Sequence, residues 1–118
     1  MLTLPSSLRV FAKTRPTDMR KSFDSLVALV REGLGYDPLS GHLFVFRSRR
    51  GDRIKLLWWD RDGLTLYYRR LEKGTFRFPT SNDPEARSIE VSSQELSLVL
   101  WGIDPASVQR QPRYQKAG

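Results

Sequence analysis

Cationic and aromatic side chains alternate in the middle of this sequence, and together they could bind a negatively charged polymer. If residues 53–59 and 64–70 are neighbouring strands, side-chain alternation places a mixed set of cations and rings on one face. That set is Arg53, Lys55, Trp59, Tyr67 and Arg69. Cations neutralise phosphates and aromatic rings stack on bases, so such a face could bind nucleic acid. In the alternative interpretation, Trp59 and Tyr67 form a cross-strand aromatic pair and the cations are only solvated.

The distribution of charge points to the same region. The sequence holds 20 Lys and Arg against 13 Asp and Glu, which gives a net charge of +7 and a pI near 10.2. Residues 43–78 carry ten of those cations and only four of the acids. A basic block of this kind suits a polyanionic partner, either nucleic acid or the acidic face of a protein. The expected phosphate contacts are Arg49, Arg50, Arg53 and Lys55, then Arg69, Arg70 and Lys73, with Trp59 and Tyr67 as stacking rings.

Carboxylates that could hold catalytic metal ions do not form a convincing set. Two-metal phosphoryl transfer needs carboxylates that converge on ions about 4 Å apart. Asp60 and Asp62 are close in sequence, but Asp-x-Asp-Gly is typical of a hairpin turn, where such side chains hydrogen-bond the backbone. A metal nuclease built on this pair is therefore the least favoured interpretation. Cysteine is absent and His42 is the only histidine. We predict no catalytic residue, no metal site and no cofactor.

Two helices are expected to position the basic block. Apolar residues recur at helical spacing through residues 17–33, and Thr17 or Asp18 can cap the first turn. The second helix spans residues 92–102 and begins at the capping box Ser92-x-x-Glu95. A glycine ends each segment, as is common at helix C-termini.

The remaining apolar segments are typical of strands. They are residues 8–13, 43–47, 53–59, 64–70 and 88–91. Turns that contain Gly and Asp separate the three middle strands, which predicts an antiparallel meander. We expect an α+β fold with an antiparallel sheet of four to five strands, the first helix across one face and the second closing the core near the sheet edge. Residues 1–106 should form a single domain and residues 107–118 a flexible C-terminal tail.

The hydropathy of the sequence indicates the cellular compartment of the protein. No apolar run approaches the roughly 20 residues that a membrane span needs. The first residues lack the basic and apolar regions of a secretory signal. We therefore expect a soluble cytoplasmic protein that has no membrane partner and no small-molecule substrate.

Five ordered blocks of the sequence, within residues 8–104, resemble one bacterial family. The blocks are Arg15–Asp24, Ser40–Phe46, Arg49–Lys55, Trp59–Gly63 and Arg70–Phe76. They are similar to the TnpB accessory protein, the second open reading frame of IS66-type insertion sequences, which is unrelated to the RNA-guided nuclease of the same name. Ser22 and Ser25 stand where this family usually has Gly, a change that should strengthen the first helix.

The resemblance implies a small non-catalytic protein that supports transposition beside a separate transposase. Two roles stay open for it. In the first, the basic aromatic surface binds DNA at the ends of the element. In the second, the same surface docks on the transposase or its companion protein without touching DNA, because Trp, Tyr and Arg are also enriched at protein interfaces.

Overall fold

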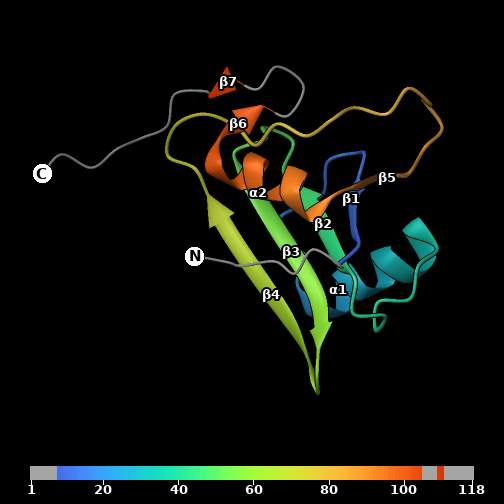
Figure 1. The fold of residues 1–118 in the computed structure, drawn as a ribbon. Coiled ribbons are helices and arrows are strands. Elements are labelled where there is room, and N and C mark those ends of the chain that lie inside the picture. The colour runs from blue at the N-terminus through green and yellow to red at the C-terminus, as the bar shows by residue number, and fades with distance from the viewer. Residues whose placement is uncertain (1–7, 105–108, 111–118) are drawn as a thin grey trace, which may run out of the picture.

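The computed structural model describes residues 8–104 and 109–110 of the chain. The elements are β1 (Val10–Lys13), α1 (Phe23–Ala28), η1 (Leu29–Leu34), β2 (Leu43–Arg47), β3 (Arg53–Asp60), β4 (Gly63–Arg70), β5 (Ser88–Val91), α2 (Ser93–Trp101), β6 (Ile103–Asp104) and β7 (Gln109–Arg110). The predicted α+β class and single compact domain are confirmed. Figure 1 shows how the strands and helices are arranged.

Five strands form one sheet in the order β4-β3-β2-β1-β5. The meander of β2, β3 and β4 is antiparallel, as predicted, and β5 is antiparallel to β1. The expectation of a wholly antiparallel sheet is wrong at one place, because β1 and β2 are parallel. Residues 14–42 form a helical crossover between these two strands, and such a connection returns the chain in the same direction.

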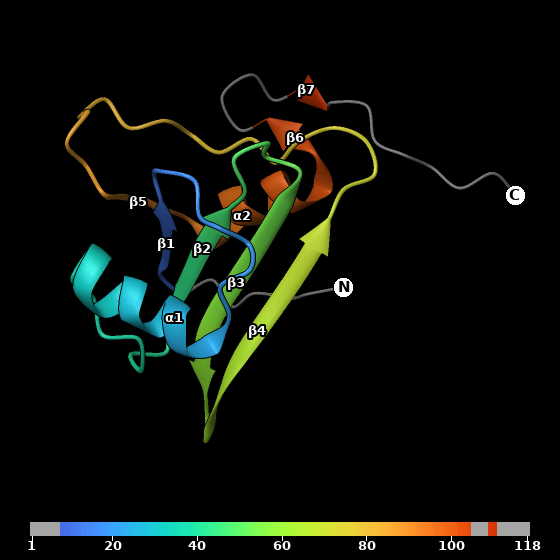
Figure 2. The same cartoon turned by 180° about the vertical axis from the view of Figure 1, so that it is seen from behind.

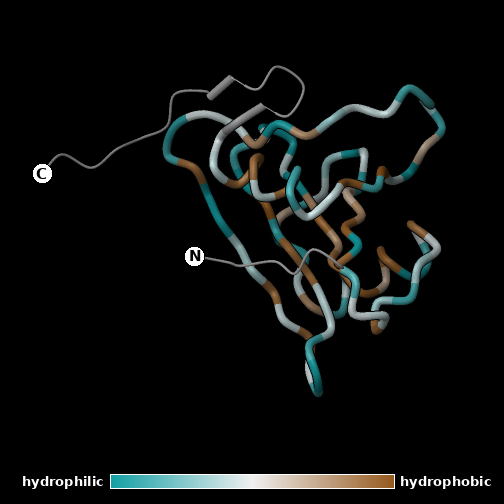
Figure 3. Tube along the Cα trace, viewed as in Figure 1, coloured by the Kyte–Doolittle hydropathy of each residue, from teal (hydrophilic) through white to brown (hydrophobic). Residues whose placement is uncertain are grey.

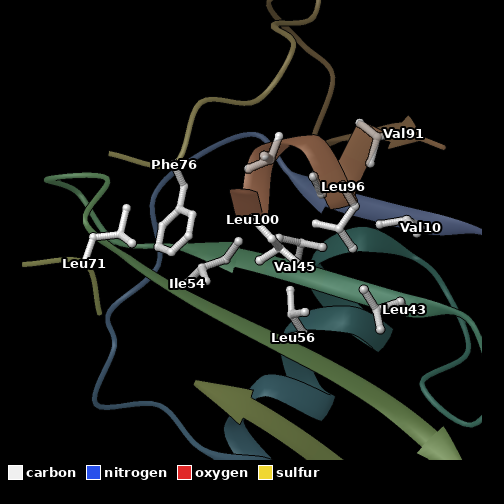
Figure 4. Close-up of a cluster of buried hydrophobic side chains, with 12 residues drawn as sticks. Val10, Leu43, Val45, Ile54, Leu56, Leu71, Phe76, Val91, Leu96 and Leu100 are labelled. Atoms are coloured by element: carbon white, nitrogen blue, oxygen red, sulfur yellow. The ribbon is translucent and has the colours of Figure 1, made fainter. Parts of the chain in front are cut away.

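The two helices cover opposite faces of the sheet, so the core has two layers. On one face α2 contributes Leu96, Val99 and Leu100 to a cluster with Val45 and Ile54 (Figure 4). On the other face, Leu26 and the η1 residues Val30 and Leu34 pack against β1, β2 and β3. Figures 1 and 2 show α2 and α1 on opposite sides of the strands. The expectation that the second helix lies near the sheet edge is wrong, because its apolar stripe is buried on a face.

The first helix begins later than the sequence spacing suggests. Asp18 accepts hydrogen bonds from the backbone N–H and the guanidinium of Arg20, so its carboxylate stabilises a turn and does not cap a helix. Ser22 is the N-cap, and its N–H donates to the Ser25 hydroxyl at 3.0 Å. The helix continues as η1, which is a π-helix, and ends at Gly35 with a φ of 76°.

The second helix begins where the capping box predicts. The Ser92 hydroxyl accepts a 3.0 Å hydrogen bond from the Glu95 N–H, and the Glu95 carboxylate accepts one of the same length from the Ser92 N–H. Gly102 ends the helix with a φ of 84°. Within residues 8–104 and 109–110, no helix is long and apolar enough to cross a membrane.

Most of the predicted tail, residues 107–118, lies outside the described part of the chain. Its described residues, Gln109 and Arg110, pair with β6 as a second, two-stranded sheet. The boundary proposed at residue 106 therefore stays a prediction.

Candidate nucleic-acid interface

The topology of the sheet gathers cations at one of its ends. Because β1 and β2 are parallel, the C-terminal ends of both strands lie there. Because β2, β3 and β4 are antiparallel to their neighbours, the first residue of β3 and the last residue of β4 lie at the same end. The register places Arg47 opposite Ile54, and Ile54 opposite Arg69. We call this region the basic end. It consists of Lys13, Arg15, Arg47, Arg49, Arg50, Arg53, Arg69, Arg70, Lys73 and Arg77.

Two turns are tied together at the basic end. The Leu71 N–H donates to the Asp52 carbonyl and the Phe76 N–H donates to the Gly51 carbonyl, both at 2.8 Å. Gly51 has a φ of 78°, and a Cβ there would lie 3.4 Å from the Thr75 side chain. These bonds hold the Lys73 turn beside the turn that carries Arg49 and Arg50.

Several guanidinium and ammonium groups at the basic end have no protein partner. Within the described residues, no hydrogen bond or ion pair engages the side chains of Arg15, Arg49, Arg50, Arg69, Lys73 and Arg77, and all six are exposed. Arg70 differs, because its guanidinium forms an ion pair with Glu72 at 3.0 Å. Arg53 donates a long hydrogen bond of 3.4 Å to the Tyr68 hydroxyl. The unpartnered cations are free to contact an external anion.

The charge at the basic end affects the pKa of Lys13. Burial is the largest cause that lowers this pKa, and the positive charges of Arg47, Arg15 and Lys21 lower it further. The Lys13 ammonium donates to the carbonyl oxygens of Arg15 and Pro16, both at 3.1 Å. Carbonyl groups, not carboxylates, therefore satisfy this ammonium, and the local excess of positive charge persists.

Lys55 is not part of the exposed surface, contrary to expectation. Its side chain is buried, with only 6% of the residue exposed. The ammonium donates to the carbonyl oxygens of Met19 at 2.8 Å and Lys21 at 2.6 Å, and lies 4.6 Å from the centre of the Tyr68 ring. Lys55 thus holds the segment before α1 against the sheet, and in this arrangement it does not reach a phosphate.

The rings and cations expected on one face are divided between the two faces of the sheet. The hairpin pairs Asp60 with Gly63, so every odd-numbered residue of β3 pairs with an even-numbered residue of β4. Trp59 therefore pairs with Leu64, and Tyr67 pairs with Leu56. Paired residues share a face, so the Trp59–Tyr67 pair of the alternative interpretation is also wrong. Arg53, Lys55 and Trp59 lie on the face of α1, whereas Tyr67 and Arg69 lie on the face of α2.

Tyr68 is the ring that sequence reasoning missed. It is 48% exposed, and its ring and hydroxyl contact Lys55 and Arg53. Tyr67 instead packs partly buried against the core on the face of α2. Trp59 is half-buried near the hairpin at the opposite end of the sheet. Tyr68 and Tyr67 lie on different faces of the sheet because of the pairing register, and the alternating pattern of the strand does not specify that register.

The acidic hairpin lies at the end of the sheet opposite the basic end. Asp60 and Asp62 flank Arg61, whose φ is 58°, and the Asp62 N–H donates to the Asp60 carbonyl at 2.7 Å. This confirms the turn interpretation, and Figure 3 shows the hydrophilic hairpin tip. Among the described residues, no group of three or more His, Asp or Glu side chains is placed to hold a metal ion. His42 packs edge-on against the Phe11 ring, with centroids 5.9 Å apart.

The sequence is similar to one protein family and to two bacterial proteins. Residues 8–110 match the family described as IS66 Orf2 like protein. The uncharacterized protein y4jC of Sinorhizobium fredii (strain NBRC 101917 / NGR234) is 40% identical over 105 residues, which cover 89% of this chain and 87% of y4jC. The uncharacterized protein y4hO of the same strain is 41% identical over 118 residues, the full length of both chains. No solved structure matches.

Proposed function

Since this chain belongs to the IS66 Orf2 like protein family, we propose that it supports transposition by binding DNA through the basic end of its sheet. The chain is an accessory protein of an IS66-type element. In this proposal it works in the bacterial cytoplasm with the transposase and its companion protein, at the DNA ends of the element. It supplies binding and positioning, and the transposase supplies the chemistry.

The observation that carries this proposal is the convergence of unpartnered cations from separate parts of the chain. Arg49 and Arg50 come from the β2–β3 turn, Arg69 from the end of β4, and Lys73 and Arg77 from the segment that follows. Asp52 and Glu72 are the carboxylates in those turns. The Glu72 carboxylate is engaged by Arg70, and Asp52 accepts a hydrogen bond from the Ser48 hydroxyl at 3.2 Å.

Phosphate is the chemical group that such a surface recognises. A guanidinium binds a phosphate with two parallel N–H bonds, and each contact releases counterions from DNA. Arg49, Arg50, Arg69 and Lys73 are the proposed phosphate contacts, with Arg53 and Arg70 secondary because each already has a protein partner. Lys55 is omitted because its ammonium is used internally. Tyr68 replaces Trp59 and Tyr67 as the proposed stacking ring, since it is exposed beside Arg53.

The test compares the salt dependence of DNA binding between variants. Fluorescence anisotropy with a labelled duplex gives the affinity of the wild-type chain and of the Arg49→Ala/Arg50→Ala variant at several salt concentrations. We expect the double variant to bind more weakly and to lose about 2 from the log–log salt slope, roughly one for each phosphate contact. The matched control is Arg31→Ala, which removes an exposed arginine on η1, away from the basic end, whose side chain has no partner among the described residues. Equal affinity and slope in the double variant would contradict the proposal.

A second candidate function rests on the free edge of β4. This strand pairs with β3 on one side, and no described strand pairs with its other side. Figure 1 shows β4 as the outermost arrow of the sheet. An unpaired edge of eight residues can accept a strand from a partner, which would be the transposase or its companion protein. Co-elution with the purified transposase after nuclease treatment, together with no DNA binding, would favour this function over the first.

A further inference from the structure

A pocket of about 630 Å³ lies on the face of α2, next to the basic end. Its walls come from the ends of β1 and β2 and from the segment that follows β4. In Figure 1 this segment passes over the end of the sheet to reach β5. The Thr14 hydroxyl donates to the Ala86 carbonyl at 2.7 Å, and the Thr14 N–H donates to the Arg87 carbonyl at 3.0 Å. These bonds attach the end of the segment to the sheet beside the pocket.

Cations outnumber carboxylates in the lining of this pocket. Lys13, Arg15, Arg47 and Arg77 contribute to it, whereas Asp83 is the only acidic residue among the described part of its lining. The Asp83 carboxylate already accepts the Glu85 N–H at 2.9 Å, so it is engaged in a turn of the same segment. The pocket therefore favours an anionic ligand.

The four cations differ in how much of their hydrogen-bonding capacity is used. Arg47 donates from Nη2 to the Thr14 carbonyl at 2.7 Å, which leaves other N–H groups of its guanidinium available. The side chains of Arg15 and Arg77 have no hydrogen bond or ion pair with the described residues, and both residues are exposed. Burial is the largest cause that lowers the pKa of Lys13, and the positive charges of Arg47, Arg15 and Lys21, which a bound anion would offset, lower it further.

The pocket also has an apolar and aromatic wall. Val45, Ile89, Phe76 and Phe78 line it. Phe76 belongs to the buried core, while Phe78 is half-buried. The volume exceeds what a bare phosphate needs and falls within the range of small-molecule sites. Cations beside an aromatic wall match a ligand that carries a phosphate at one end and a flat base at the other.

We infer that this pocket binds a single nucleotide through its phosphomonoester, with Arg15 and Arg77 on the phosphate and Phe78 beside the base. A phosphomonoester carries a charge of about −1.5 to −2 at neutral pH, more than one phosphodiester of a DNA backbone, which suits several cations better. Such a group occurs on a free nucleotide and on the phosphorylated end of a DNA strand. The four cations of the pocket belong to the basic end, but neither Arg49 nor Arg50 lines the pocket.

Isothermal titration with deoxyadenosine monophosphate tests the inference. We expect binding to the wild-type chain, with at least about tenfold weaker binding of deoxyadenosine, which lacks the phosphate. The Arg15→Ala/Arg77→Ala variant should lose at least about tenfold in affinity for the nucleotide. Arg31→Ala, the matched exposed arginine outside the pocket, should bind it like the wild type. Circular dichroism of each variant establishes that the fold is intact.

A second arm identifies the source of the phosphate. Anisotropy compares the same short single strand with and without a 5′-phosphate. Tighter binding of the phosphorylated strand, lost in Arg15→Ala/Arg77→Ala, assigns the pocket to a strand end. Nucleotide binding with equal affinity for the two strands assigns it to a free nucleotide.

Three results would overturn the inference. They are no nucleotide binding together with no end effect in the wild-type chain, equal binding by the double variant, and binding of a glutamate-rich peptide in place of the nucleotide. The DNA-binding proposal stands or falls separately, because it predicts loss of affinity in Arg49→Ala/Arg50→Ala whatever the state of the strand end.

Discussion

The ammonium of Lys55 donates a 2.8 Å hydrogen bond to the carbonyl oxygen of Met19, although the two residues are 36 positions apart in sequence. This bond and a second one to the Lys21 carbonyl join β3 to the segment that leads into α1. A lysine in the middle of a basic block thus contributes to the fold, while its neighbours remain available to ligands.

Replacing Lys55 should reduce stability and leave the DNA surface in place. Lys55→Met keeps the aliphatic stem but leaves two carbonyl groups without their donor, so we expect a loss of about 1–3 kcal/mol in the free energy of unfolding. Urea denaturation measures it. Arg69→Met is the control, because Arg69 is exposed and unpartnered among the described residues. A Lys55→Met variant with unchanged stability and weakened DNA binding would show that this ammonium is solvent-exposed.

Tyr68 should matter for single-stranded DNA more than for the fold. Tyr68→Leu removes an exposed ring, and base stacking on such a ring is worth about 1–3 kcal/mol per base, or roughly tenfold in affinity. Anisotropy with a single strand measures the loss. Tyr67→Leu provides the comparison, since Tyr67 packs against the core and its replacement should mainly lower the unfolding midpoint. The assignment of Tyr68 fails if the two variants bind the strand equally well.

Leu96, on the face of α2, should contribute as much to the free energy of unfolding as Leu26 does on the face of α1. Its side chain is fully buried between α2 and the sheet, so we expect Leu96→Ala to cost about 2–5 kcal/mol. Leu26→Ala, on the face of α1, should cost a similar amount. Leu98→Ala serves as the control because Leu98 is only half-buried. A small loss for Leu96→Ala alone would mean that α2 does not cover a face of the sheet.

The turn at Asp18 should weaken in acid. Hydrogen bonds from the Arg20 side chain and backbone lower the pKa of the Asp18 carboxyl to about 2, from an ordinary value of 3.8. Because the folded-state pKa is the lower one, the stabilisation is present above 3.8 and is lost as the pH falls toward about 2. Thermal unfolding across this range should show a smaller acid-induced decline for Asp18→Asn than for the wild-type chain. The effect should shrink in high salt, since the ion pair is exposed.

We expect the fold to tolerate the loss of the Thr17 hydroxyl. Thr17 is buried, and its hydroxyl oxygen has no hydrogen-bond partner among the residues that the structure describes. Thr17→Val keeps the shape and removes an unsatisfied polar group, so we expect no loss of stability and a gain of up to about 1 kcal/mol. Urea denaturation measures it, with Thr14→Val as the contrasting variant because the Thr14 hydroxyl is bonded to Ala86. Marked destabilisation by Thr17→Val would indicate a partner for this hydroxyl in solution.

Signals carried by neighbouring residues were sufficient for much of the fold. The capping box of Ser92 and Glu95 correctly placed the start of α2, and the Asp-x-Asp-Gly turn correctly placed the hairpin. Each depends on hydrogen bonds within a few residues, so the sequence alone contains the whole interaction. The start of α1 differs from the prediction, which gave Thr17 or Asp18 as the cap: the Asp18 carboxylate bonds Arg20, and Ser22 is the N-cap.

The composition of the candidate site depends on contacts that are distant in sequence. That residues 43–78 are basic is evident from the amino acids alone, and the five sequence blocks already indicated the IS66 family. Which cations remain free is decided by the path of the chain: the segment before α1 supplies the carbonyl groups that engage Lys55. Likewise, the register of the β3–β4 hairpin decides which tyrosine is exposed, because it places Tyr67 and Tyr68 on opposite faces of the sheet.

The helical crossover makes β1 and β2 parallel and so brings Lys13 and Arg15 beside Arg47 and Arg77. Strand direction and pairing register are properties of the assembled sheet, because a local pattern of alternating side chains is compatible with either direction and with more than one register.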